Sequence, residues 1–188
     1  MSFKSTQKAL HSSRLTSFPS HQSFIYNRMG FASFTDEYTS AVAPSRIFKA
    51  SILDSHNLIP KLLPQGIKSI EIIQGDGGAG SIKQVNFIDG RNFSSVKYHI
   101  DELNEDKYTY NYTLLEGDAL VENLEKITYE VKFESSSSGG TISKVTSKYY
   151  TKGDFILKEE DIKSGKEKVL MMYKVVEAYL LQNPDAYV

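Results

Sequence analysis

In Ile73-Gln74-Gly75-Asp76-Gly77-Gly78-Ala79-Gly80-Ser81-Ile82-Lys83, four glycines stand within six residues. The segment before them, Ile70 to Ile73, is mostly apolar, and the residues after them alternate between apolar and polar up to Phe87. A P-loop or a dinucleotide-binding fingerprint would need a helix after the glycines, whereas a strand-like pattern follows them here. We therefore predict a rigid, non-catalytic loop between two strands, made by Gly75, Gly77, Gly78 and Gly80.

The hydrophobic pattern around this loop has a period of two, which is typical of strands. Residues 31–42 read as a first strand, and Pro44 then opens two short helices at 45–53 and 55–62. Turn residues such as Asp89-Gly90 and the run 135–140 separate the later segments into an antiparallel meander. The six later strands are predicted at 69–74, 81–88, 94–101, 107–115, 125–134 and 141–150.

The last segment, 161–182, has apolar residues at helical spacing on one stripe, with Lys and Glu on the other side. At 1.5 Å per residue, this helix would be about 33 Å long, enough to cross a domain. The order of elements predicts an α+β fold in which a curved antiparallel sheet of seven strands grips one long C-terminal helix.

The glycine loop with its flanks, Ile72 to Lys83, is similar to the signature of the plant pathogenesis-related class 10 proteins, the family of the major birch pollen allergen. The resemblance extends over about residues 29–188, with Gln74 and Ser81 departing from the Glu and Thr that the family commonly has. It implies a helix-grip, START-like fold with an internal hydrophobic cavity. The other matching segments are Pro44-x-Arg46-Ile47-Phe48-Lys49-Ala50, Asn57-Leu58-Ile59-Pro60-Lys61, Tyr110-Asn111-Tyr112, Glu116-Gly117-Asp118, Lys148-Tyr149-x-Thr151-Lys152-Gly153-Asp154 and Tyr179-Leu180-Leu181.

Tyrosines gather on one face of the predicted strands, as in 107–115, where Tyr108, Tyr110, Tyr112 and Leu114 alternate with polar residues. Such a face is either ordinary core or the wall of an amphipathic cavity, because buried phenols need hydrogen-bond partners. The family resemblance favours the cavity. We expect the ligand-binding residues to be Phe87, Tyr110, Tyr112, Tyr129, Tyr149 and Met172.

The resemblance implies a plant defence or stress protein that reversibly binds small hydrophobic metabolites or hormones, of flavonoid, cytokinin or steroid type. A ribonuclease is the alternative, because some family members are reported to cleave RNA. Carried over by position, its residues would be Lys83, Glu125, Glu177 and Tyr179. No G-x-S-x-G elbow, Cys–His pair or paired-carboxylate motif supports an enzyme.

A third hypothesis is an inhibitor of a phosphatase that resembles the abscisic acid receptors, which share the architecture. Their gate loop reads Ser-Gly-Leu-Pro-Ala and their latch reads His-Arg-Leu. The corresponding segments here are Ile88-Asp89-Gly90-Arg91-Asn92 and Leu115-Glu116-Gly117-Asp118, so both signatures are missing.

The composition of this 188-residue chain limits the kinds of ligand and partner that we expect for it. Cysteine is absent and the four histidines lie far apart, so we expect neither a metal site nor a cofactor. No apolar run is long enough for a membrane span. Residues 29–188 carry a net charge of −5 and read as one ligand-binding domain, for which we expect a monomer and contact with nucleic acid only under the ribonuclease alternative.

Residues 1–28 differ from the rest, with four basic residues, no acidic ones and seven serines. This composition predicts a disordered extension. It is either a transit-like peptide or the product of a misassigned start site or gene model, since family members begin at a Met-Gly pair such as Met29-Gly30. We expect a protein of the cytoplasm and also of the nucleus, or a plastid protein if the extension is a true transit peptide.

Overall fold

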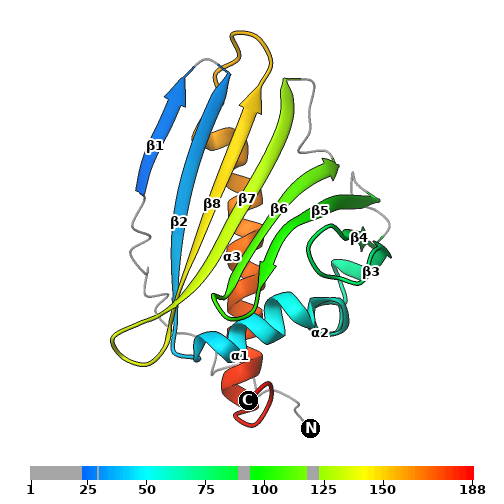
Figure 1. The fold of residues 1–188 in the computed structure, drawn as a ribbon, viewed down its shortest axis with the longest axis vertical. Helices are drawn as coiled ribbons and strands as arrows, with labels where there is room; N and C mark the ends of the chain where they lie inside the picture. Colours follow the sequence, from blue (N-terminus) through cyan, green and yellow to red (C-terminus); the bar gives the residue numbers. More distant parts are fainter. Residues whose placement is uncertain (1–22, 29, 89–93, 118–122) are drawn as a thin grey trace, which may run out of the picture.

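The computed structural model describes residues 23–28, 30–88, 94–117 and 123–188. Within these residues, eight antiparallel strands form one curved sheet with the order β1-β2-β8-β7-β6-β5-β4-β3 (Figure 1). Consecutive strands are neighbours except that β2 pairs with β8, which brings the two ends of the meander together. The strands are β1 Ser23–Arg28, β2 Phe31–Ser40, β3 Ile67–Gln74, β4 Ile82–Phe87, β5 Ser95–Asn104, β6 Thr109–Glu116, β7 Leu124–Ser135 and β8 Thr141–Thr151.

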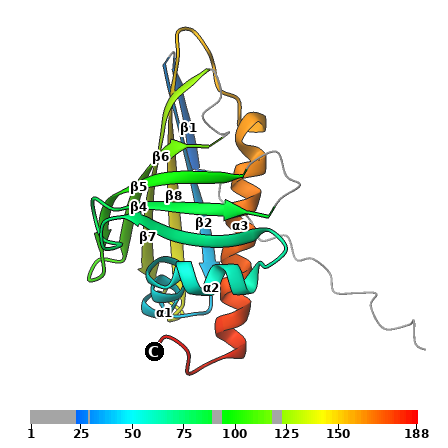
Figure 2. The ribbon, with the colours of Figure 1, turned by 90° about the vertical axis from the view of Figure 1, so that its right-hand side faces the viewer.

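Helices cover one face of this sheet. A short helix α1 (Pro44–Phe48) continues as one π-helical turn, η1 (Lys49–Leu53), and is followed by α2 (Ser55–Leu62). The long helix α3 (Glu159–Gln182) runs along the sheet, with α1 and α2 at its C-terminal end (Figure 2). The predicted α+β fold, with two short helices after the first long strand and a long C-terminal helix, is confirmed.

The sequence pattern explains which side chains face α3. Burial alternates residue by residue along β8, so one face of this strand is covered and the other is half exposed. On α3, the predicted apolar stripe is buried at Ile162, Tyr173, Val176 and Leu180. The inner face of the sheet and the stripe of α3 therefore form the interior of the domain.

The interior has two parts. A large cluster joins α1, η1, α2 and the C-terminal half of α3 to the sheet, with Phe48, Phe133 and Val176 fully buried in it. A smaller cluster lies around the start of α3 and includes Phe34, Tyr149 and Ile162. The ion pair between Lys166 and Asp36, at 2.9 Å, links this part of α3 to β2.

One expectation is wrong for a short segment of the N-terminal extension. Residues 1–22 lie outside the described residues, but Ser23–Arg28 forms β1, paired antiparallel with β2, instead of being disordered. The segment Phe24-Ile25-Tyr26 is rich in residues that favour strands, and the edge of β2 offers it unpaired backbone groups. The predicted seven strands are present as β2 to β8, and β1 is an eighth strand at the edge.

Candidate functional site

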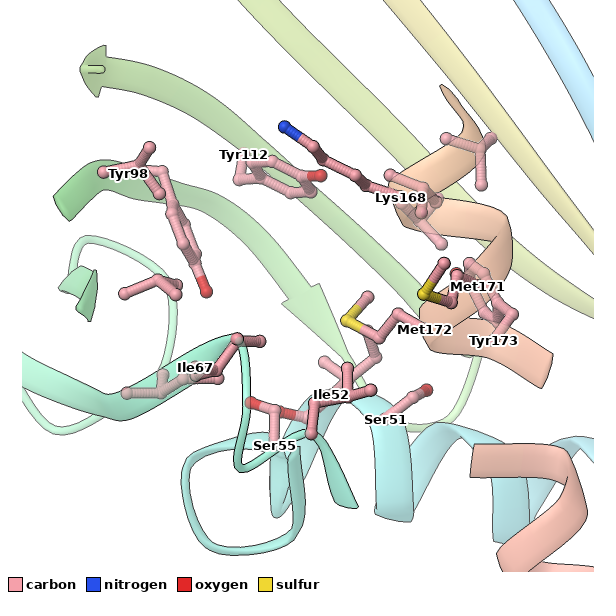
Figure 3. Close-up of a pocket in the computed structure, with 18 of the residues that line it drawn as sticks. Ser51, Ile52, Ser55, Ile67, Tyr98, Tyr112, Lys168, Met171, Met172 and Tyr173 are labelled. Atoms are coloured by element: carbon pink, nitrogen blue, oxygen red, sulfur yellow. The ribbon is translucent and has the colours of Figure 1, made fainter. Parts of the chain in front are cut away.

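A cavity of about 480 Å³ lies between the sheet, η1, α2 and α3 (Figure 3). Most of its wall is apolar, with Ile52 from η1, Ile67 and Ile70 from β3, and Met172 from α3. Its volume lies within the range of about 300–1,000 Å³ that is typical of small-molecule sites. The cavity is the candidate functional site.

The alternation of side chains along each strand determines which residues form the sheet side of the cavity wall. Pairs of residues two apart line the cavity from three consecutive strands, because side chains at this spacing share a face. The pairs are Val85 and Phe87 on β4, Val96 and Tyr98 on β5, and Tyr110 and Tyr112 on β6. The helix side of the wall comes from Lys168, Val169, Met171, Met172 and Tyr173, which lie on adjacent turns of α3.

Tyrosines form a connected group within this wall. The Tyr112 ring lies 5.1 Å from Tyr98 and 5.3 Å from Tyr110, measured between ring centroids, and stacks on Tyr129 at 4.8 Å. Tyr98 and Tyr110 are also close enough that each affects the pKa of the other. Burial raises the pKa of Tyr98 to about 12 and holds the pKa values of Tyr110 and Tyr112 well above the ordinary phenol value. These phenols stay neutral at physiological pH, so each can donate or accept a hydrogen bond.

Two serines at the helix end of the cavity are tied to their own backbone. Ser51 Oγ donates to the Ile47 carbonyl at 2.6 Å, and Ser55 Oγ donates to the Ile52 carbonyl at 2.9 Å. Each hydroxyl keeps lone pairs that can still accept a hydrogen bond. The serines thus add acceptor oxygens to a wall that is otherwise apolar at this end.

Lys83 lies buried just behind the wall. Its ammonium donates to the Ile52 carbonyl and to Ser55 Oγ, both at 3.4 Å, and stands 5.8 Å from the centre of the Tyr110 ring. In the described part of the chain, no carboxylate forms an ion pair with it. Burial lowers the pKa of Lys83 because the apolar surroundings disfavour the charged form.

Four of the six residues predicted to bind ligand line the cavity, namely Phe87, Tyr110, Tyr112 and Met172. Among the described residues of the lining, neither Tyr129 nor Tyr149 is present. Tyr129 stacks behind Tyr112, and Tyr149 packs edge-on against Phe34 at 5.9 Å in the smaller cluster. Both share the inner face of the sheet with the tyrosines of β6, but they contact neighbouring aromatic rings and not the cavity.

The residues expected for RNA cleavage lie in separate surroundings. Lys83 is buried against η1 and α2, whereas Glu125 is exposed at the start of β7. Glu177 on α3 accepts a hydrogen bond from the backbone N–H of Ala41 at 3.1 Å, and Tyr179 packs against the larger cluster. Among the hydrogen bonds and ion pairs of the described residues, none joins two of these four side chains.

Two backbone N–H groups of the glycine loop donate to side chains of the loop and of Ser81, directly after it. The Gly77 N–H donates to Ser81 Oγ and the Gly78 N–H donates to Asp76 Oδ1, each at 2.9 Å. Gly75 has a φ of 86°, and a Cβ there would lie 2.4 Å from Ser81 Oγ, so the turn needs glycine at this position. The loop fits a rigid connection between β3 and β4, and its glycines are not among the described residues that line the cavity.

Three further expectations concern regions or groups away from the cavity. Residues 89–92 of the expected gate position and Asp118 of the expected latch lie outside the described residues. Within the described residues, no three His, Asp or Glu side chains are grouped so that they could hold a metal ion. The helices of this part of the chain include none with the length and apolarity of a membrane span.

Several lining residues were missed at the level of sequence. Tyr98 and Val96 alternate in β5 like the tyrosines of β6, so their period-two pattern could have identified them. Lys168 and Met171 offered no such signal, because they lie beside the apolar stripe of α3 and not within it. The structure shows that both are exposed residues of α3 that also line the cavity.

Comparisons with known proteins agree with this geometry. A family model described as "Pathogenesis-related protein Bet v 1 family" matches residues 29–183. The major strawberry allergen Fra a 1.05 of Fragaria ananassa is 52% identical over 159 residues, which cover 85% of this chain and 99% of that relative. Major allergen Pru av 1 of Prunus avium is 50% identical over 159 residues, with the same coverage. The crystal structure of Ara h 8.0201 matches with a TM-score of 0.73 and 39% identity, covering 81% of this chain and 99% of that one.

Proposed function

Because the chain belongs to the pathogenesis-related protein Bet v 1 family, we propose that it reversibly binds small, mostly apolar metabolites in the cavity between the sheet and α3. The observation that carries this proposal is the cavity itself, about 480 Å³ in volume and lined by apolar side chains and neutral phenols. A filled core would leave no such space, since protein interiors are packed as densely as organic crystals.

The wall favours ligands that are flat, apolar over most of their surface and edged with hydroxyl groups, such as flavonoids, cytokinins or steroids. Tyr98, Tyr110 and Tyr112 present rings for stacking and hydroxyls for hydrogen bonds. Met172 adds a flexible side chain that adapts to different ligand shapes. We expect micromolar affinity, or about −8 kcal/mol, from a roomy and adaptable site.

The biological role proposed with this binding is the transport or buffering of such metabolites during plant defence or stress. No chemical step is part of it, and the dispersed positions of Lys83, Glu125 and Glu177 give RNA cleavage no support from geometry. Binding and release are then the whole mechanism. The phenols orient the ligand and α3 closes one side of the cavity.

Native mass spectrometry of the protein purified from its own tissue, followed by denaturing extraction, tests the proposal directly. We expect a small aromatic or steroid-like molecule in near-stoichiometric amount. A ligand-free protein that also fails to bind a hydrophobic fluorescent dye would overturn the proposal.

A cavity-filling variant tests the location of the site. Val85 lines the cavity from β4, and Val85→Phe adds a ring that would occupy part of its volume, so we expect dye affinity to fall about tenfold or more. The matched control is Gln84→Phe. Gln84 directly precedes Val85 on the same strand, and its side chain donates a hydrogen bond to Asn86 on the other face of the sheet. Equal dye binding by the two variants would contradict a site in this cavity.

A further inference from the structure

The charge carried by the described residues of the cavity lining is positive. Among the described residues that line it, Lys168 is the charged one, and none is Asp or Glu. Figure 3 shows the Lys168 side chain reaching from α3 toward the ring of Tyr112. A ligand in this cavity therefore meets a positive group and no carboxylate of the lining.

Lys168 lies at the opening of the cavity. Lys168, Met171 and Gln65 are exposed residues and also line the cavity, so they mark where it meets solvent. The other lysine near the cavity, Lys83, directs its ammonium to the Ile52 carbonyl and to Ser55 Oγ behind the wall. The two lysines therefore differ in position, since Lys83 is buried behind the wall and Lys168 is an exposed residue of the lining itself.

We propose that the ligands preferred by this chain are hydroxylated aromatic carboxylates, and that Lys168 is the residue that selects them. The aromatic body would lie among the tyrosines, and the carboxylate would pair with the Lys168 ammonium at the opening. This inference rests on the proposed function, because it specifies the ligand of the same cavity.

Physical chemistry favours this orientation over its reverse. A carboxylate at the opening keeps part of its hydration, whereas at the inner end it would lose its hydration among apolar side chains and neutral phenols. The hydroxyl end of the ligand can instead exchange its water for Tyr98 and Tyr110, whose hydroxyls both donate and accept. The methylene stem of Lys168 can lie along the apolar wall while its ammonium stays near solvent.

Two probes that differ only in charge test the proposal. They are 4′-hydroxystilbene-4-carboxylate and the corresponding primary carboxamide, and their binding is measured by isothermal titration calorimetry. The proteins compared are the wild type, Lys168→Gln and Lys168→Arg. Lys174→Gln is the matched control, because Lys174 is an exposed lysine on the same helix that is not part of the cavity lining.

We expect the wild type to prefer the carboxylate, and Lys168→Gln to bind it about fivefold more weakly, the size of effect that an ion pair near solvent allows. Lys168→Gln should leave the carboxamide affinity unchanged, Lys168→Arg should keep the preference, and added salt should reduce it. Lys174→Gln should behave like the wild type.

Other results would overturn the proposal in ways that can be told apart. If the wild type binds both probes equally, or if Lys168→Gln weakens both alike, the selection by charge is wrong while ligand binding in the cavity stands. If neither probe binds and a hydrophobic dye is also not bound, the proposed function fails together with this inference.

Discussion

Tyr112 is the central residue of the site at the scale of single side chains. It contacts three other tyrosine rings, Tyr98, Tyr110 and Tyr129, at centroid distances between 4.8 and 5.3 Å. These contacts fix the ring in the wall, so its hydroxyl is presented to the cavity in a defined position. A fixed donor and acceptor loses little side-chain entropy when it binds a ligand.

Replacing this hydroxyl separates polar recognition from apolar burial. We expect Tyr112→Phe to weaken the binding of a hydroxylated flavonoid by about 1 kcal/mol, the net value of one hydrogen bond. The affinity for an apolar dye should stay the same, since the ring is kept. Calorimetric titration of both ligands measures the difference, and Tyr150→Phe, on the outer face of β8, is the control. An equal loss for the two ligands would mean that the Tyr112 hydroxyl does not recognise polar groups.

The fate of the predicted ligand-binding residues shows what a sequence pattern can and cannot specify. The alternation of apolar and polar residues along the strands predicts that Tyr110, Tyr112, Tyr129 and Tyr149 share one face of the sheet. In the structure, all four lie on that face. The pattern does not tell how far along a curved sheet the cavity extends. Tyr149 lies where Phe34 and the start of α3 fill the space, and this packing depends on contacts between residues distant in sequence.

Among the elements, α3 determines whether the cavity is enclosed. Its C-terminal end is held to α1 by Arg46, whose guanidinium donates to the carbonyls of Leu180, Asn183 and Ala186 at 2.8–3.1 Å. Its N-terminal half is held to β2 by the pair between Lys166 and Asp36. The helix is thus fixed at both ends, and the residues between them, including Met172, form the wall of the cavity.

Gly165 is a weak point of this helix. It lies inside α3 with nothing within 4 Å of the position that a Cβ would take, so Gly165→Ala should raise the free energy of unfolding by about 0.5–1 kcal/mol through lower backbone entropy in the unfolded chain. Gly80→Ala is the control, because Gly80 has equal space but a φ of 88° and should lose stability. Chemical denaturation measures both, and a destabilised Gly165→Ala would show that the helix needs glycine there.

Most elements were predictable from sequence because their patterns are local. The long helix, the two short helices and strands β2 to β8 all follow from apolar periodicity and from proline, glycine and acidic turn residues. Strand β1 was not predicted, because a short run of strand-favouring residues forms a strand only where a free edge such as that of β2 is available to pair with it. The π-helical turn η1 was also not predicted. Apolar periodicity indicates a helix, but it does not show where the helical turn takes one extra residue.

The whole molecule is expected to lose stability at alkaline pH. Burial raises the pKa of several tyrosines in the wall, so above about pH 10 the unfolded state releases phenolic protons that the folded state keeps. The stabilisation by these neutral phenols is complete below pH 10 and is lost as pH rises toward the folded-state values, which begin at about 12 for Tyr98.

Unfolding by urea at a series of pH values measures this loss. Tyr98→Phe removes one of the shifted phenols, so between about pH 10 and 12 its stability should decline less steeply than that of the wild type, by up to about 1.4 kcal/mol per pH unit. Identical slopes for the two proteins would contradict a buried, neutral Tyr98.

The order of the elements along the chain has a consequence for biosynthesis. Strands β2 to β8 all precede α3, so a nascent chain leaves the ribosome with a tyrosine-rich, concave sheet that α3 does not yet cover. Exposed apolar surface of this kind promotes aggregation until the last helix is translated and docks. During translation, the surface that we propose to receive a metabolite is therefore exposed to chaperones before α3 covers it.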